Sequence, residues 1–209
     1  MKYDNCRSRY REFRYGLPQG SCLSPILFNV FLRDVFNPRD FTASREGGVY
    51  ADDIRVSAFG DSVEEAGANL TEMLTSVREW DSKNCARFDL DSDKCGYVVF
   101  SRQVQRDPDV RFGTTPLRRV RVHKCLGVYL DQALNFSHHI EQVKAKSWRA
   151  YHSVRQVVGN DWGASLNAVK RLYEGLVRPV LEYACVVWDG ATPGEKVKLE
   201  RVHTDPFRS

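Results

Sequence analysis

The sequence predicts an α+β fold, and three patterns carry that prediction. Apolar and polar residues alternate on both sides of Asp52 and Asp53, which indicates two short strands joined by a tight turn. A long amphipathic stretch follows that turn, with a helix-capping signal in front of it. Beyond about Asn135 the apolar residues recur only at helical spacing. We therefore expect an α+β region over residues 1–132 and an all-helical region over residues 133–209.

Composition excludes several classes of protein. The chain has 209 residues, a formal net charge of +4 and six cysteines without a CxxC pair, so a disulfide scaffold and a zinc knuckle are not expected. No apolar run reaches the roughly 18 residues of a membrane helix, and the N-terminal segment lacks the apolar core of a secretory signal. The chain is therefore expected to be intracellular, in the cytoplasm or nucleus, with no membrane partner.

The first half of the chain predicts two helices around one hairpin. A helix is expected over residues 25–36, with Ser24 as its N-cap, and its apolar composition predicts burial on most of its circumference. Residues 47–60 predict the hairpin. Apolar residues at alternating spacings of three and four then predict a helix behind a capping box; they are Val63, Ala66, Leu70, Met73, Val77 and Trp80, and the box is Ser62 with Glu65.

The second half begins with strands and ends in helices. A strand is expected at about residues 96–101, and two or three more around residues 113–116 and 124–125. Four helices should follow. Their expected ranges are 137–158 behind a Ser137 cap, 166–176, 179–188, and a last helix from Pro193 behind a Thr192–Glu195 capping box.

Two adjacent carboxylates are the first candidate site. Asp-Asp pairs are common on solvated turns, so Asp52 and Asp53 carry no function by adjacency alone. Here the flanking strands would hold both carboxylates at one rigid point. Hard oxygen ligands so placed suit Mg²⁺, which takes one or two protein carboxylates together with substrate phosphates. A phosphoryl-transfer site is therefore plausible at this turn.

Five segments, in order, resemble a known family. GLPQGSCLSPILFNVFL and YADDI, followed by FDLDSDKCGYVVFSR, KCLGVYLDQALNFSHHI and LVRPVLEYACVVW, are similar to the reverse transcriptases of non-LTR, jockey-like retrotransposons. The likeness extends from about Gly16 to His203. It implies an RNA-directed DNA polymerase with a right-hand architecture, in which residues 1–132 form part of a palm and residues 133–209 a helical thumb.

The resemblance also implies roles for individual residues. Asp52 and Asp53 would bind catalytic Mg²⁺, two ions in the complete enzyme, and Lys94 would lie near the departing pyrophosphate, although a solvated surface lysine is an equal alternative. The residues expected near the primer end, the template and the incoming deoxynucleoside triphosphate are Tyr50, Ala51, Gly16, Pro18, Gln19 and Gly20.

Basic side chains in the second half form the expected contact with the RNA template and DNA primer. They are Arg118, Arg119, Arg121 and Lys124 ahead of the LGVYLD segment, and Lys144 and Lys146 on the following helix. A cationic strand edge that discourages aggregation is the competing interpretation of the first group.

One block of the family pattern is not found ahead of the GLPQG segment. Reverse transcriptases carry a further aspartate in an F-x-x-D block some fifty residues before that segment, and only fifteen residues precede Gly16. We therefore expect the chain to be a truncated copy, inactive by itself unless an upstream polymerase half completes it. A non-catalytic nucleic-acid-binding remnant is the alternative.

Overall fold

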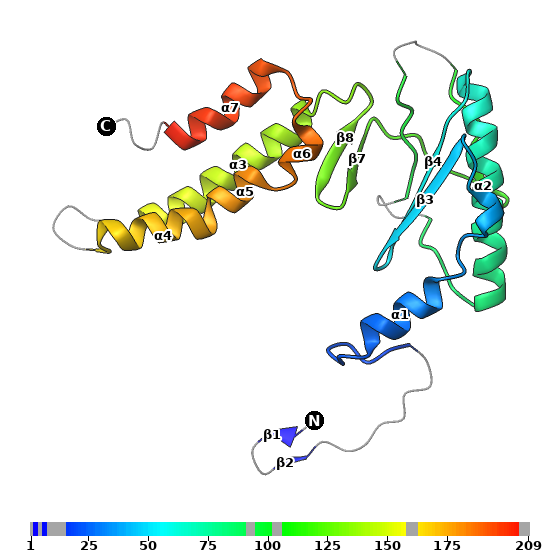
Figure 1. Ribbon diagram of the computed structural model, residues 1–209, viewed down its shortest axis with the longest axis horizontal. Helices are drawn as coiled ribbons and strands as arrows, with labels where there is room; N and C mark the ends of the chain where they lie inside the picture. The colour runs from blue at the N-terminus through cyan, green and yellow to red at the C-terminus, as the bar shows by residue number, and fades with distance from the viewer. Residues whose placement is uncertain are drawn as a thin grey trace. The chain divides into compact units, whose positions relative to one another are not determined.

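The computed structural model describes residues 2–3, 6–7, 16–90, 95–101, 106–157 and 163–204 (Figure 1). The chain divides into two compact units. Unit 1 contains Met1–Phe88 and Arg106–Pro116, and unit 2 contains Asp89–Gln105 and Leu117–Ser209. Both mix helices with two-stranded antiparallel sheets, in agreement with the predicted α+β class. Among the described residues, no helix has the length and apolarity needed to cross a membrane.

Unit 1 is organised around one hairpin and one long helix, which lie along each other (Figure 1). In chain order its elements are β1 (Lys2–Tyr3), β2 (Cys6–Arg7), α1 (Ser24–Leu32), a 3₁₀ turn (Pro38–Asp40), β3 (Arg45–Tyr50), β4 (Asp53–Ala58), α2 (Val63–Asn84), β5 (Arg111–Phe112) and β6 (Thr115–Pro116). The predicted hairpin is confirmed, because β3 and β4 pair in register from Arg45 opposite Ala58 to Tyr50 opposite Asp53.

Helix α2 matches its sequence pattern closely. The Ser62 hydroxyl accepts a hydrogen bond from the Glu65 amide at 3.0 Å, as the capping box predicts. The Glu65 carboxylate instead accepts from the amide of Asp61, one residue ahead of the expected partner. Met73 and Val77 are buried at 0% and 2% exposure, and Trp80 packs edge-on against Phe31 of α1. The predicted apolar stripe is therefore the face that α2 buries.

Three predictions for α1 are wrong, namely its cap, its end and its burial on most of its circumference, since Ile26, Leu27 and Val30 are all more than half exposed. Ser24 is the first helical residue, not the cap, and its hydroxyl donates to the Pro18 carbonyl at 2.7 Å. The helix ends at Leu32 instead of Phe36, because Asn37 starts the 3₁₀ turn with its own capping box and the following Pro38 disfavours helical geometry at Asn37. Leu32 is the only buried residue of α1, and no described element covers the side that carries Val30.

Unit 2 consists of a short hairpin followed by helices. Its elements are β7 (Val122–Cys125), β8 (Val128–Asp131), α3 (Ser137–Arg155), α4 (Leu166–Leu176), α5 (Arg178–Glu182), α6 (Cys185–Trp188) and α7 (Pro193–Thr204). The strand predicted over residues 96–101 is wrong, because Tyr97 lies in an isolated bridge with Arg119. In that bridge the Tyr97 amide donates to the Arg118 carbonyl, and the Val120 amide donates to the Tyr97 carbonyl.

A strand carboxylate binds the loop ahead of α3, and the N-cap residue of that helix, Phe136, makes no side-chain cap. Asp131, the last residue of β8, accepts hydrogen bonds from the amides of Ala133, Asn135 and Phe136 at 2.8–3.2 Å. Ser137 is the first helical residue, so the prediction that it caps the helix is wrong. The helix ends at Arg155 instead of the predicted Val158, which itself lies outside the described residues. Its buried face carries Ile140, Val143, Ser147 and Val154.

The helix predicted over residues 179–188 is two helices. The chain leaves helical geometry at Tyr183 (ψ 124°) and turns at Ala184, which has a left-handed φ of 52°. The tyrosine hydroxyl donates to the Leu126 carbonyl in the β7–β8 turn at 2.8 Å, a tertiary bond that short-range spacing does not encode. The capping box predicted for α7 is incomplete. The Glu195 carboxylate does not accept a hydrogen bond from the Thr192 amide, because its Oε1 pairs with Lys198 and its Oε2 has no partner.

Candidate functional site

The two adjacent aspartates lie at the end of the β3–β4 hairpin. Ala51 and Asp52 form a two-residue turn, and Asp53 opens β4 opposite Tyr50; we call Tyr50–Asp53 the hairpin tip. Ala51 has a left-handed φ of 51°, which fits the primed turns that two-residue hairpins prefer. Strand pairing thus leads into the tip from both sides, and the two aspartates lie at the junction of two strands, as the sequence predicts.

Both carboxylates are exposed and available to a ligand. Within the described part of the chain, the side chain of neither Asp52 nor Asp53 makes a hydrogen bond or an ion pair. Strand alternation separates the faces of the hairpin: Ile54 and Val56 are half-buried on the α2 side, while Asp53 and Arg55 are exposed on the other. Tyr50 shares the face of Asp53 and is 64% exposed.

The donor set at the tip fits a magnesium ion in part. Two adjacent carboxylates are the number of protein ligands that Mg²⁺ usually takes, the rest being water and substrate phosphate. Among the described residues, no group of three or more His, Cys, Asp or Glu side chains gathers at any point. Asp52 and Asp53 would therefore offer a cation an open pair of ligands, not a closed cage.

The GLPQG segment is a turn ahead of α1. Gly16 and Gly20 have φ values of 75° and 86°, and nothing lies within 4 Å of the position that a Cβ would take at either residue. The turn is closed by the Pro18 carbonyl, which accepts from the Ser21 amide and the Ser24 hydroxyl. Pro18, Gln19 and Gly20 are exposed. Their accessible backbone leaves room for a ligand to approach closely.

Unit 1 has a hollow that is lined by residues of both α1 and the hairpin. It has a volume of about 520 Å³ and is lined by residues of α1, by the segment that follows α1, and by Val49 of β3. Asn29 and Arg33 are its polar lining residues. Neither residue was predicted from the sequence to be functional; the available signal was two long polar side chains four positions apart on an otherwise apolar helix.

The basic candidates belong to unit 2 and differ in their surroundings. Arg119 donates to Gln132 at 3.3 Å, and Lys124 lies over the Tyr129 ring at 5.8 Å. Arg118 and Arg121 lie on the segment that enters β7, and the Arg121 side chain is exposed. We call Arg118–Lys124 the basic segment. The structure brings its four candidates onto one stretch of chain that leads into the β7–β8 hairpin.

The two lysines of α3 do not share a face. They are two positions apart, which separates them by about 200° around a helix. Lys144 is half-buried and lies 3.8 Å from Glu141, whose pKa is lowered chiefly by its hydrogen bond from Lys198 and further by Lys144. Lys146 is exposed. Lys94 lies outside the described residues.

Neither histidine at the start of α3 belongs to a metal site among the described residues. His139 is 2% exposed, accepts a hydrogen bond from the Tyr129 amide at Nδ1, and has a buried Nε2 without a partner. Burial, followed by the charges of Lys146 and His138, lowers its pKa. His139 is therefore a buried side chain of unit 2.

Comparison with known protein families identifies the family of this chain. The family described as "Reverse transcriptase (RNA-dependent DNA polymerase)" matches residues 1–109, which contain both the GLPQG turn and the hairpin tip. The chain belongs to the reverse transcriptase family. This reverse transcriptase segment matches no solved structure.

Individual relatives of this reverse transcriptase segment come from retrotransposons. "RNA-directed DNA polymerase from mobile element jockey" of Drosophila funebris is 32% identical over 196 residues, which cover 88% of this chain and 20% of the relative. The protein of the same name in Drosophila melanogaster is 26% identical over 100% of this chain and 23% of its own length. A "Putative 115 kDa protein in type-1 retrotransposable element R1DM" of Drosophila melanogaster is 29% identical over 83% of this chain and 17% of its own length. The chain therefore spans about a fifth of the length of these relatives.

Proposed function

We propose that this chain is the metal- and primer-binding part of an RNA-directed DNA polymerase of a non-LTR retrotransposon. The observation that supports this most is the hairpin tip, where the carboxylates of Asp52 and Asp53 are adjacent, exposed and without partners in the described part of the chain. In this proposal residues 1–132 form part of a polymerase palm and residues 133–209 a thumb.

The proposed chemistry follows from the surroundings of the tip. A divalent cation held there would make a primer 3′-hydroxyl more acidic and neutralise charge on the nucleotide phosphates. Asp52 and Asp53 supply its oxygen ligands. Tyr50, on the same face as Asp53, supplies an exposed ring against which the primer sugar packs, and the single methyl of Ala51 leaves room for close approach.

The remaining candidates bind and orient the nucleic acid and the nucleotide. The GLPQG turn offers its open backbone and the Gln19 amide to the incoming deoxynucleoside triphosphate or the template base. The basic segment and the lysines of α3 neutralise backbone phosphates of the template–primer duplex. Lys94 remains our candidate for a charge beside the departing pyrophosphate.

A second candidate function follows from the small number of metal ligands at the hairpin tip. Because the described residues bring no third acidic, histidine or cysteine ligand to the tip, the chain alone holds fewer ligands than a two-ion mechanism uses. In this alternative the chain binds nucleic acid through the basic segment without catalysis. An upstream polymerase half that carries the F-x-x-D block would restore the third carboxylate.

Primer extension on an RNA template separates the two functions. The chain is assayed alone and mixed with a polypeptide that carries the upstream half of a related element, in Mg²⁺. The proposal expects incorporation in the mixture, and expects Asp52→Asn to reduce it at least about 100-fold because the metal ligand is lost. Incorporation that Asp52→Asn leaves intact would contradict it. Salt-sensitive RNA binding with no incorporation in either sample would favour the non-catalytic function.

A further inference from the structure

The hollow beside α1 combines an apolar floor with polar groups on one side. Leu32, Phe36, Phe41 and Val49 supply apolar lining, and its volume of about 520 Å³ lies within the range of roughly 300–1,000 Å³ typical of small-ligand sites. Asn29 and Arg33 supply a carboxamide and a guanidinium to the same hollow. Such a lining suits a ligand that is flat and apolar in one part and anionic in another.

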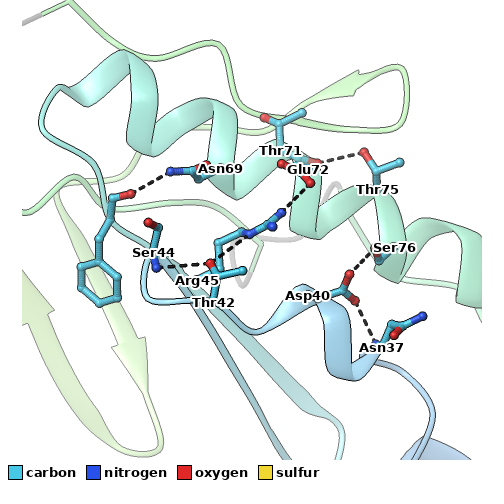
Figure 2. A network of polar contacts seen from close by, with 11 residues as sticks. Asn37, Asp40, Thr42, Ser44, Arg45, Asn69, Thr71, Glu72, Thr75 and Ser76 are labelled. Atoms are coloured by element: carbon cyan, nitrogen blue, oxygen red, sulfur yellow. Dashed lines mark hydrogen bonds and ion pairs between the residues drawn. The ribbon is translucent and has the colours of Figure 1, made fainter.

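The two polar residues have unused hydrogen-bonding capacity. Asn29 and Arg33 are four positions apart along α1 and its C-terminal end, so their side chains lie on one face of the helix. Both residues are exposed, and neither side chain has a hydrogen-bond or ion-pair partner among the described residues. Arg45 of the same unit differs, since it is bonded to Glu72 at 2.7 Å (Figure 2). Arg33 therefore offers a planar fork of donors to an external phosphate or carboxylate.

The aromatic side of the hollow offers a stacking surface. The rings of Phe36 and Phe41 meet edge to face with centroids 5.7 Å apart. Phe41 nevertheless remains 46% exposed. Phe41 and Arg33 line the same hollow, and an exposed aromatic ring combined with a basic side chain is an arrangement with which proteins bind nucleotides of a single strand.

This hollow is separate from the hairpin tip. Val49, which lines it, precedes Tyr50 on β3, and neighbouring residues of a strand face opposite sides of the sheet. Tyr50 shares its face with Asp53, so the hollow lies on the other face of the hairpin. A ligand in the hollow is therefore not the nucleotide that reacts at the tip.

We propose that the hollow binds one unpaired nucleotide of a nucleic-acid strand, with the base stacked on Phe41, the phosphate on Arg33 and a base edge on Asn29. The choice of a nucleotide over other aromatic anions rests on the proposed polymerase function. The site is an accessory one, which would hold a strand behind the hairpin while the tip carries the metal.

Calorimetric titration of the whole chain with adenosine 5′-monophosphate tests the proposal, with adenosine as the probe that lacks the phosphate. We expect the monophosphate to bind and adenosine to bind at least about tenfold more weakly. Arg33→Gln should weaken the monophosphate about tenfold, the loss of one charge-assisted contact, and should abolish the preference over adenosine. Phe41→Leu should weaken both probes by a similar factor.

Arg39→Gln is the matched control, because Arg39 is exposed on the neighbouring 3₁₀ turn but does not line the hollow. Its affinity for the monophosphate should equal that of the parent chain. Absence of binding, or equal losses in Arg33→Gln and Arg39→Gln, would overturn the proposal. Asp52→Asn separates the two proposals: unchanged binding of the monophosphate supports a second site, and lost binding assigns the nucleotide to the hairpin tip.

Discussion

The hydroxyl of Ser76, in the middle of α2, donates a hydrogen bond of 2.9 Å to Oδ1 of Asp40, which lies 36 positions earlier in the chain. The other oxygen of Asp40 accepts from the Asn37 amide at 2.9 Å (Figure 2). Asp40 is 9% exposed. One buried carboxylate thus closes the 3₁₀ turn and fastens the segment between α1 and β3 to α2.

Replacement of Asp40 by alanine should therefore destabilise unit 1. The change leaves the Ser76 hydroxyl and the Asn37 amide without their acceptor, and we expect a loss of about 1–3 kcal/mol in the free energy of unfolding. Urea unfolding followed by tryptophan fluorescence measures it. Asp34→Ala is the control, since Asp34 is exposed on the same segment and should change stability by less than about 0.5 kcal/mol. Equal effects of the two changes would disprove the role of Asp40.

Gly47 on β3 should not tolerate a side chain. A Cβ there would come within 2.7 Å of both Met73 and Phe36, and Met73 is fully buried. We expect Gly47→Ala to destabilise by about 1–3 kcal/mol through overpacking. At the next residue, Gly48, the nearest atom to a Cβ is an Arg55 nitrogen at 3.8 Å, so Gly48→Ala should be nearly neutral in the same unfolding assay. A neutral Gly47→Ala would show that this face of the hairpin does not pack on Met73.

The stability of unit 2 should fall in mild acid because of His139. Burial and the positive charges of Lys146 and His138 lower its folded-state pKa, so below about pH 6.5 the unfolded chain binds the proton more readily. Stability from this group is complete above that pH and is lost as the pH falls below it. Protonation of Nδ1 would also remove the acceptor that the Tyr129 amide uses.

Urea unfolding between about pH 5 and 7.5, the range in which histidine titrates, measures this dependence. His139→Gln should flatten the curve of stability against pH, whereas His152→Gln should leave its slope unchanged, because His152 is exposed near the end of α3. A slope that survives His139→Gln would assign the acid sensitivity to another group.

The basic segment should determine how RNA binding depends on salt. Each Lys or Arg that neutralises a phosphate contributes about 0.7–0.9 to the slope of log affinity against log salt concentration. We expect the double change Arg121→Gln and Lys124→Gln to reduce that slope by about 1.5. Lys170→Gln is the control: Lys170 is exposed on α4 and pairs with Glu174. Slopes that fall equally in both variants would contradict a role for the basic segment.

The sequence predicted those elements well whose structure depends on residues close together in the chain. Helix α2 has 22 residues, a serine cap and a full apolar stripe, so its position follows from sequence spacing alone. The β3–β4 hairpin is also local, because alternation and a two-residue turn fix its register. This is why residue spacing is sufficient to assign Asp52 and Asp53 to a turn between two strands.

The failed predictions depend on distant contacts. Asp131, not the nearer Ser137, satisfies the amides ahead of α3, because the end of β8 positions its carboxylate there. The hydroxyl of Tyr183 bonds to Leu126, 57 positions away, at the place where the expected helix breaks. Burial of α1 was inferred from composition, which does not say whether another element covers it. The sequence also did not identify Asn29 and Arg33 as candidate binding residues. Only the hollow that they line distinguishes them from polar residues on a solvated helix face.

Paramagnetic relaxation by Mn²⁺ tests the central claim most directly, since it detects cation binding at the hairpin tip without requiring turnover. Manganese added to the isotope-labelled chain should broaden the backbone amide resonances of residues 50–54 first, and an excess of Mg²⁺ should restore them. The paired change of Asp52 and Asp53 to asparagine should remove the effect while leaving the hairpin resonances in place. Broadening that begins elsewhere, or that persists in this variant, would contradict the assignment of the tip as the metal site.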